Sequence, residues 1–480
     1  MAGVFERANT PLFLVGGAVR NPLMGLPISD VDVCGPATPH EVLSLCEGTD
    51  IHAHLRAAHF GTVELRIADA DGTRHMAEYT TFREDSYRCG HQPSEVRFAK
   101  SLSVDALRRD FSVNALYLPV VASGAGEVND PTGGLEHLRM GVLHTVTADP
   151  DQVLKDDGLR ILRAVRFQAE LGLMPTKELL ASAARFAPLL GDIAPERLRD
   201  EFVKVLTADF RYGEGVACMK PPQKGENGCH PIDTPDVLCS NTQHAGADSI
   251  SARLSCQLPS HPSYFSVLSG LRTLVRIGAW EFLFPDLAYE ESGAGAIERL
   301  EVPSGVSVVA GRLALLFWKA DAEPFRESLR ALCIAERETG QAVRLLEGMQ
   351  RLMASSLAEP LSVFEAAKLG LPVLTFTRNA FVALVGGKGE GNSARAEMRR
   401  CAAHAEALIH YLSKGVPLSL RELAINGNDL KPVMEEAGCP FREMGALLDY
   451  LWECAVERTI ANEREALLSV AASWARTEVF

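Results

Sequence analysis

Two aspartates near the start of the chain, Asp30 and Asp32, are separated by a single residue. The segment 28–35 alternates apolar and polar residues, which predicts a strand with both carboxylates on one face. Two like charges this close are costly without a cation, and carboxylate oxygens suit magnesium that handles nucleotide phosphates. The pair therefore predicts a magnesium site, with a solvated strand face as the alternative. Glu78 lies in a later β-type stretch and either completes this site or is an exposed sheet residue.

Two glycines, Gly16 and Gly17, follow the apolar run of a predicted strand over 13–17. Glycines at this point let the chain turn tightly into a helix, whose first amide groups can receive phosphate oxygens. Arg20 follows within reach of the same anion. An ordinary strand-to-helix turn has the same pattern, so the glycines become informative only together with the aspartates.

Arginines and acids gather in two further segments. The first, 108–115, holds Arg108, Arg109, Asp110 and Asn114, whose forked donors and polar groups suit a phosphate and a ribose hydroxyl. In the second, 156–167, three-residue steps on a helix give a polar stripe opposite an apolar one; its members are Asp157, Arg160, Arg163 and Arg166. A charged surface cluster and a solvated helix face are the respective alternatives.

The elements that must position these residues are of two kinds. Short strands are predicted over 62–67 and 74–81, and a helix capped by Thr38 over 38–46, which gives a mixed α/β unit on a small sheet. From residue 151 the pattern changes to long amphipathic helices over 151–171, 176–187 and 195–208, and residues 264–480 are almost entirely helical in pattern. Between them, 213–262 is rich in proline and glycine and predicts a flexible insert; its cysteines and histidines lack the close spacing of structural zinc sites.

Length and charge limit the function classes. A chain of 480 residues exceeds one ordinary core and predicts several packed units. The formal net charge of −14 argues against a histone-like DNA wrapper, so we expect no DNA partner. The longest apolar run, 313–318, is far shorter than the roughly 20 residues of a membrane span. The first ten residues include Glu6 and Arg7, and eleven cysteines form no C-x-x-C pair. These features predict a cytoplasmic chain with reduced thiols and no membrane partner.

Taken together, the motifs resemble the family of class II tRNA nucleotidyltransferases (CCA-adding enzymes) and bacterial poly(A) polymerases. The strings that carry the resemblance are LVGGAVR, SDVDV, FGTVEL, EYTTFR, DALRRDFSVNAL, DPTGGLEHLR and DDGLRILRAVRF, over residues 12–172. Two later strings, FLFPDL at 282–287 and ELAINGNDLKPVME at 422–435, are similar to the family's helical C-terminal portion.

The resemblance implies an α+β fold with a polymerase-β-like head on a small mixed sheet, followed by a helical neck, body and tail. It places the head at 1–148, the neck at 149–212, the insert at 213–262, and the body and tail, a probable RNA-binding region, at 263–480. The implied reaction transfers nucleotides from CTP and ATP to the 3′ end of tRNA, with magnesium as cofactor.

The same resemblance implies a role for each residue of the motifs. Asp30 and Asp32 would bind the metal, with Glu78 as a third catalytic carboxylate. The nucleotide would be held by Gly16, Gly17, Arg20, Arg109, Asp110, Asn114, Arg163 and Arg166, and its base read by Asp157 and Arg160. The chain departs from the family's pattern at Asn21, where aspartate is usual, at Asp156, where glutamate is usual, and at Gly158 inside the predicted base-reading helix.

Alternatives remain within and beyond this chemistry. A poly(A) polymerase, or an enzyme that adds only part of CCA, would share the same site. A catalytically silent RNA-binding relative is the alternative of another class, and the carboxylate pair counts against it because binding alone has no use for a metal site. A nucleotidyltransferase acting on a small molecule is disfavoured, because the long helical half suits a large partner.

Overall fold

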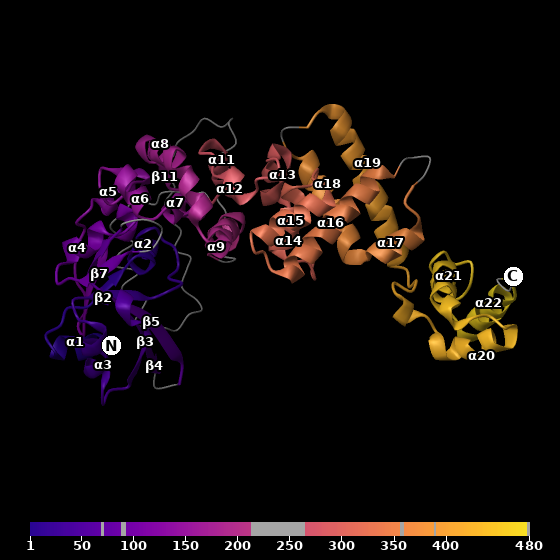
Figure 1. Ribbon diagram of the computed structural model, residues 1–480, viewed down its shortest axis with the longest axis horizontal. Helices are drawn as coiled ribbons and strands as arrows, with labels where there is room; N and C mark the ends of the chain where they lie inside the picture. The colour runs from indigo at the N-terminus through magenta and orange to yellow at the C-terminus, as the bar shows by residue number, and fades with distance from the viewer. Residues whose placement is uncertain (69–71, 88–92, 213–264, 356–359, 388–389, 478–480) are drawn as a thin grey trace, which may run out of the picture. The chain divides into compact units, whose positions relative to one another are not determined.

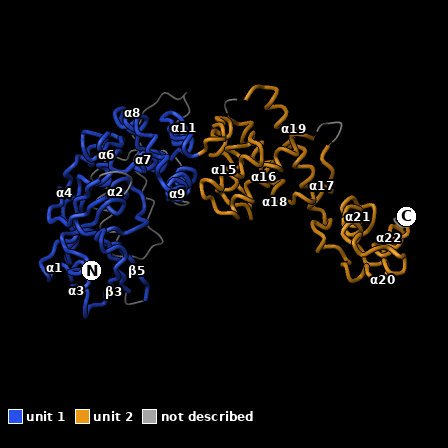
Figure 2. Tube along the Cα trace, viewed as in Figure 1, with its two compact units in different colours: residues 1–283 blue, residues 284–480 orange. Residues whose placement is uncertain are grey.

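The computed structural model of the chain describes all residues except 69–71, 88–92, 213–264, 356–359, 388–389 and 478–480 (Figure 1). The chain forms two compact units, residues 1–283 and 284–480 (Figure 2). The insert predicted at 213–262, including its cysteines and histidines, lies outside the described residues. The finer division into head, neck, body and tail at 1–148, 149–212 and 263–480 stays a prediction.

A seven-stranded mixed sheet, in the order β3-β4-β5-β2-β1-β8-β9, forms the centre of the first unit. Only β2 and β5 pair in parallel, and the other neighbours are antiparallel. The strands are β1 Phe13–Val15, β2 Asp32–Gly35, β3 Ile51–Ala57, β4 Thr62–Ala68, β5 Arg74–Thr81, β8 Tyr117–Val121 and β9 Gly124–Ala125. Two-stranded pairs are formed by β6 Arg83–Ser86 with β7 Glu95–Phe98, and by β10 Val142–Leu143 with β11 Met174–Pro175.

Apolar side chains are buried on both faces of this sheet. Val33 of β2 belongs to one core cluster with Phe5 and Val42, whereas Cys34 belongs to a second cluster with Phe82 and Tyr117. Because successive side chains of a strand point to opposite faces, Asp32 faces the same side as Cys34. The sheet thus presents a carboxylate on the face that carries the second cluster.

Helices complete the first unit. They are α1 Ala2–Arg7, α2 Gly17–Leu23, α3 Pro39–Cys46, α4 Leu102–Leu107, α5 Gly134–Met140, α6 Pro150–Asp156, α7 Leu159–Leu171, α8 Lys177–Phe186, α9 Pro195–Leu206, α11 Val267–Arg276 and α12 Trp280–Leu283. The predicted cap of α3 is confirmed, since the Thr38 hydroxyl accepts from the Glu41 amide and Glu41 bonds back to Thr38. The predicted strands over 62–67 and 74–81 are confirmed as β4 and β5.

The predicted strand over 28–35 is too long. β2 begins only at Asp32, and Asp30 lies in the bend before it. Val33 is the first residue of β2 that pairs with β1, whereas Asp32 pairs with Glu78 of β5. Before Asp32 the ladder to β5 ends with the bond that the Glu78 amide donates to the Val31 carbonyl. The two aspartates are neighbours, but not as alternate residues of one regular strand.

The single helix predicted over 151–171 is also wrong. It is two helices, α6 and α7, separated at Asp157, whose backbone is extended at φ −148° and ψ 107°. Gly158 is the N-cap of α7 and not an interior residue, so it imposes no interior-glycine cost on that helix. Asp157 consequently lies before the helix that carries Arg160, Arg163 and Arg166.

The second unit is helical, as predicted. Its helices are α13 Glu291–Ala296, α14 Val308–Leu316, α15 Ala322–Ala331, α16 Glu336–Ala354, α17 Val363–Leu369, α18 Leu371–Val385, α19 Asn392–Leu412, α20 Gly427–Ala437, α21 Met444–Val456 and α22 Arg464–Thr477. Within the described ranges no single helix is long and apolar enough to cross a membrane; only α17 and α18 taken together, which meet at 96°, have the length and composition.

Candidate nucleotide-transfer site

A cavity of about 760 Å³ in the first unit gathers the chemistry that the sequence predicted. Twelve of the thirteen predicted site residues line it: Gly16, Gly17, Arg20, Asp30, Asp32, Arg109, Asp110, Asn114, Asp157, Arg160, Arg163 and Arg166. They come from α2 and the glycine turn before it, from β2 and the bend before it, from the segment after α4, and from α7 and the residue that precedes its N-cap. Glu78 is the exception, because it is an exposed residue of β5 opposite Asp32 in register and does not line the cavity. Its catalytic role stays a prediction.

Gly16 fixes the approach of the turn to the carboxylates. Its φ of +66° is a backbone conformation that favours glycine, and a Cβ built there would lie 3.7 Å from the Asp32 Oδ2 atom. Helix α2 begins at the next residue, so its first turn starts beside Asp32. The glycine pair is therefore part of the site and not merely a strand-to-helix connection.

The two aspartates form a donor set that fits a divalent cation. Burial raises the pKa of Asp32, and the neighbouring Glu78 and Asp30 raise it further. A bound cation would therefore stabilise the ionised form of this carboxylate. The side chain of Asp30 is 73% exposed and accessible to a ligand. Among the described residues no group of three or more His, Cys, Asp or Glu side chains is arranged to hold a metal. Magnesium commonly uses one or two carboxylates plus substrate phosphates, so a pair satisfies this requirement.

Arg20 is 5% exposed and is held at one orientation. Its Nε and Nη2 atoms donate to the Asn21 Oδ1 atom at 3.2 and 2.7 Å, and Nη1 donates to the Asn114 side chain. Burial lowers the pKa of this guanidinium. Asn21, where the family usually has aspartate, still orients Arg20 but adds no negative charge beside it. The charge of Arg20 is therefore not offset by a carboxylate at this position.

Arg109 is tied to the buried carboxylate of Asp105. Its Nε and Nη2 atoms donate to the Asp105 Oδ2 atom at 3.1 and 3.0 Å, and Nε also donates to the Tyr117 hydroxyl at 2.9 Å. Burial opposes the charge of Arg109, but Asp105 outweighs it and the pKa of Arg109 is raised. The guanidinium is thus a fixed cation at the cavity wall.

Asp110 links two segments of the site. Its Oδ2 atom accepts from Arg163 Nε at 2.8 Å and Nη2 at 2.5 Å, while Oδ1 accepts from Asn114 Nδ2 at 3.1 Å. Burial opposes its ionisation, yet Arg163 and Arg160 hold the pKa of Asp110 well below its usual range. This ion pair, in which two Arg163 nitrogens share one carboxylate oxygen, links α7 to the 108–114 segment.

Asp157 and Arg160, the predicted base readers, line the cavity next to each other. Asp157 accepts from the Leu159 amide at 3.0 Å through Oδ1 and pairs with Arg197 at 3.4 Å through Oδ2. Arg160 donates to the carbonyl oxygens of Val153 at 3.0 Å and Arg108 at 2.7 Å. Both side chains are therefore oriented by the protein, and both retain capacity for further hydrogen bonds.

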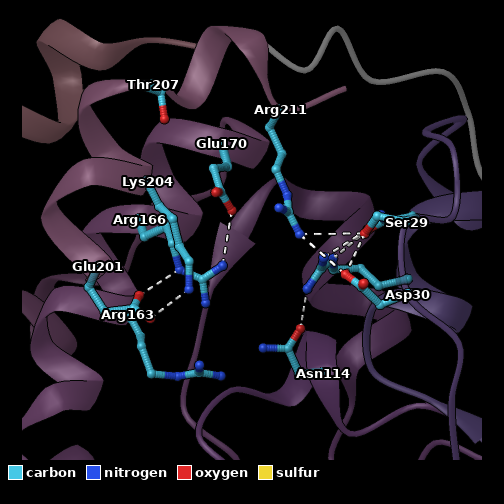
Figure 3. A network of polar contacts seen from close by, with 12 residues as sticks. Ser29, Asp30, Asn114, Arg163, Arg166, Glu170, Glu201, Lys204, Thr207 and Arg211 are labelled. Carbon is cyan, nitrogen blue, oxygen red and sulfur yellow. Dashed lines mark hydrogen bonds and ion pairs between the residues drawn. The ribbon is translucent and has the colours of Figure 1, made fainter. Parts of the chain in front are cut away.

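Phe167 is the apolar centre of the cationic wall. The guanidinium carbons of Arg20, Arg163 and Arg166 lie 5.1, 5.5 and 4.2 Å from its ring centroid. Arg166 also donates to Glu201 at 2.6 Å and to Glu170 at 3.1 Å, as Figure 3 shows. Three arginines stacked about one ring give the cavity a concentrated positive charge.

Some residues that line the cavity had no predicted role. Arg211 donates to Asp30 at 3.4 Å and to Ser29 at 3.5 Å, so it lies beside a predicted metal ligand (Figure 3). Arg83, Tyr87, Arg197 and Tyr212 also line the cavity. The string EYTTFR contains Arg83 and could have indicated it. Arg211 belongs to no recognisable motif and follows the last predicted helix of its region.

Comparisons with known proteins show what the chain is similar to. A model described as the poly A polymerase head domain matches residues 12–144, and one described as a probable RNA and SrmB-binding site of polymerase A matches residues 172–212. The chain is 26% identical over 467 residues to a CCA-adding enzyme of Enterococcus faecalis, an alignment covering 96% of this chain and 91% of that one.

Two solved structures have the same fold. The Bacillus stearothermophilus CCA-adding enzyme in complex with CTP has a TM-score of 0.62 at 22% identity, covering 99% of this chain and 95% of that one. The Thermotoga maritima CCA-adding enzyme complexed with tRNA has a TM-score of 0.59 at 17% identity, covering 98% and 93%.

The mixed sheet, the carboxylate pair beside a glycine turn and the cationic helix that faces it define a nucleotidyltransferase. The match to the head-domain model and the alignment with a relative over nearly the full chain support this class of enzyme. The chain is similar to the family of tRNA nucleotidyltransferases and bacterial poly(A) polymerases, since its residues 12–144 match the head-domain model and 467 residues align with a CCA-adding enzyme.

Proposed function

We propose that this protein adds C, C and A to the 3′ end of tRNA, using CTP and ATP without a nucleic-acid template. The observation that carries the proposal is the single cavity lined by the carboxylate pair, the phosphate-binding arginines and the Asp157–Arg160 pair. The relatives aligned over nearly the whole chain are CCA-adding enzymes, one in complex with CTP and another with tRNA, which supports the same substrates here.

In this proposal Asp30 and Asp32 hold a divalent cation, expected to be magnesium. When bound, the cation would lower the pKa of the RNA 3′-hydroxyl and stabilise charge on the α-phosphate. Arg20, Arg109 and Arg163 are fixed by hydrogen bonds to protein partners, so they bind the triphosphate without reorganising. The 3′-hydroxyl attacks the α-phosphorus in line, the bond to the β-phosphate oxygen breaks, and pyrophosphate leaves toward these cations.

Base choice is proposed to rest on Asp157 and Arg160. Cytosine and adenine each present an amine donor beside a ring-nitrogen acceptor, which match a carboxylate acceptor and a guanidinium donor. Uracil and guanine place a carbonyl oxygen where the amine should be, opposite Asp157. The unmatched polar groups then cost free energy and reject the wrong base. Asp157 lies just before α7 and Arg160 in its first turn, so packing of α7 holds both against a base.

The experiment uses purified protein, magnesium and three tRNA transcripts that end before CCA, after C and after CC. Each transcript is incubated with one nucleotide at a time. We expect CMP addition to the first two, AMP addition to the third, and a stop after CCA. Continued AMP addition to unrelated RNA would instead assign a poly(A) polymerase, and addition to only some transcripts would assign a partial enzyme.

The variant Asp30→Ala tests the carboxylate pair. We expect it to abolish transfer with all three transcripts while the circular dichroism spectrum is unchanged, because Asp30 is exposed and contributes no core contact. Appreciable residual transfer would remove Asp30 from the metal site.

RNA binding without any transfer by the wild-type protein would indicate the catalytically silent RNA-binding relative. The cytoplasmic location stays a prediction from the sequence.

A further inference from the structure

Three arginines repeat at seven-residue steps along α16 of the second unit (Figure 1). Arg337, Arg344 and Arg351 are all exposed, whereas Val343, Leu346 and Met349 of the same helix are buried. Seven residues are close to two helical turns, so the three side chains share one face and are spaced at about 10 Å steps. We call this set the arginine face.

None of the three arginines makes an ion pair or side-chain hydrogen bond with any residue that the structure describes. Several other cations of the unit are paired, as in the ion pairs Arg330–Glu336, Arg378–Glu406 and Lys319–Glu390. Residues 284–480 contain 21 lysines and arginines against 27 acids. Three unpaired guanidinium groups share this face of α16 with one acid, Glu347, and therefore give it a net positive charge within an acidic unit.

A groove of about 550 Å³ runs beside the first two arginines. Its lining includes Arg337 and Arg344, three glycines (Gly305, Gly340 and Gly370), and Glu336, whose charge is paired with Arg330. A Cβ built on Gly340 would meet nothing within 4 Å. The glycines leave space in which a bulky anion can approach the helix. No aromatic side chain lies in α16 or in the lining of this groove.

We propose that the arginine face binds the sugar–phosphate backbone of a structured RNA, and this rests on the proposed function. Arginine is the residue best suited to phosphate, because its planar fork can donate two parallel hydrogen bonds. Recognition of single-stranded RNA usually relies on bases stacked on aromatic rings, which this surface lacks. Cations spaced regularly along a helix, with no aromatic residues beside them, suit the phosphates that base-paired RNA holds at fixed positions. It would contribute affinity and not base specificity.

The test replaces all three arginines in the full chain, as R337Q/R344Q/R351Q, and measures binding to a tRNA transcript lacking CCA between 50 and 200 mM salt. Each lost phosphate contact removes about 0.7–0.9 from the salt slope, so we expect the slope to fall by about two to three and the affinity at 0.1 M salt by about 100-fold. The KM for tRNA should rise, while the KM for CTP and kcat at saturating tRNA stay unchanged. The three single variants should each lose part of the effect.

A control matched in charge is R326Q/R378Q/R442Q, which removes three arginines of the same unit that are already paired with acids. It should leave the slope and affinity unchanged. Glu347→Gln, which removes the acid on the arginine face, should tighten binding. Equal losses in both triple variants, or an unchanged slope in R337Q/R344Q/R351Q, would overturn the proposal. An equal loss on an unstructured RNA of the same length would overturn the preference for base-paired RNA.

The two proposals fail separately. If the wild-type protein adds no nucleotide, and the variant R337Q/R344Q/R351Q binds RNA more weakly than the wild type, the CCA-adding function is contradicted and the proposal for the arginine face is supported. If it adds CCA and the same variant binds RNA normally, the arginine face fails and the function stands.

Discussion

Asp105 is fully buried, and its carboxylate is the centre of the cluster that orients Arg109. Besides Arg109, it accepts from Arg108 Nε at 2.7 Å and from the Tyr117 hydroxyl at 2.7 Å. Burial opposes its ionisation, but Arg109 and Arg108 hold the pKa of Asp105 below its usual value. Although it opens the string DALRRDFSVNAL, nothing in its local sequence distinguishes it from a surface aspartate. Its role follows only from the fold, which encloses it with two arginines.

Asp105→Asn should therefore damage both stability and nucleotide binding. Removing one partner of a buried ion pair leaves an uncompensated charge, which costs about 3–5 kcal/mol in the free energy of unfolding. Arg109 loses its fixed position, so the KM for CTP should rise more than kcat falls. Urea unfolding and steady-state kinetics measure the two effects. Tyr117→Phe removes only a hydroxyl and should cost about 1 kcal/mol; equal losses in the two variants would contradict a central role for Asp105.

Asp157→Ala tests the proposed base reading at a single residue. We expect selectivity for CTP over UTP to fall about 5- to 150-fold, the equivalent of the 1–3 kcal/mol that a mismatched buried polar group costs. Asp157→Asn keeps an oxygen for the Leu159 amide and should also lose selectivity. The measurement is kcat/KM for each nucleotide with one tRNA acceptor. As a control, Asp151→Ala on α6 removes the same charge from an exposed ion pair with Arg185 of α8. It should leave selectivity unchanged.

At the scale of elements, local pattern was sufficient wherever it was strong and isolated. The alternation over 62–67 and 74–81, the Thr38 cap and the helical periodicity after residue 264 all correspond to observed elements. Local pattern was insufficient where a partner strand or a distant segment determines where an element begins or where a residue lies. β2 starts at Asp32, where its pairing with Glu78 of β5 begins, and no local pattern reports where a partner strand pairs. Arg211 could not be predicted either, because the fold brings it to Asp30 across 181 residues.

The break between α6 and α7 gives a prediction that distinguishes a cap from a helix interior. In an interior, replacing glycine by alanine stabilises a helix by about 1 kcal/mol. Gly158 is an N-cap with φ −58°, and alanine is a poorer N-cap than glycine. Gly158→Ala should therefore be neutral or slightly destabilising in thermal unfolding. Stabilisation by about 1 kcal/mol would contradict the N-cap role of Gly158.

At the scale of the whole molecule, the two units differ in where their ion pairs lie. The first unit buries several carboxylates beside arginines, among them Asp105, Asp110 and Glu201. In each case burial opposes the charge, and the arginines nevertheless lower the pKa. In the second unit the carboxylates with lowered pKa include Glu336 and Asp429, whose pairs with Arg330 and Arg464 involve at least one exposed side chain. Exposed pairs contribute little to stability, so pH sensitivity should concentrate in the unit that holds the site.

Acidification should accordingly unfold residues 1–283 before residues 284–480. A carboxyl whose pKa is lower in the folded state stabilises that state while it is ionised. Below about pH 4 the unfolded chain takes up protons first, so this stabilisation is progressively lost as the pH falls toward the folded-state pKa. Hydrogen exchange resolved by segment at pH 5, 4 and 3, corrected for the intrinsic exchange rate, should show protection disappearing first in α7 and α9 and later in α16 and α18. The order should persist in 0.5 M salt, because salt screens buried pairs much less than exposed ones. Simultaneous loss in both units, or earlier loss in α16 and α18, would show that the buried pairs around Asp110 do not control the acid stability of this protein.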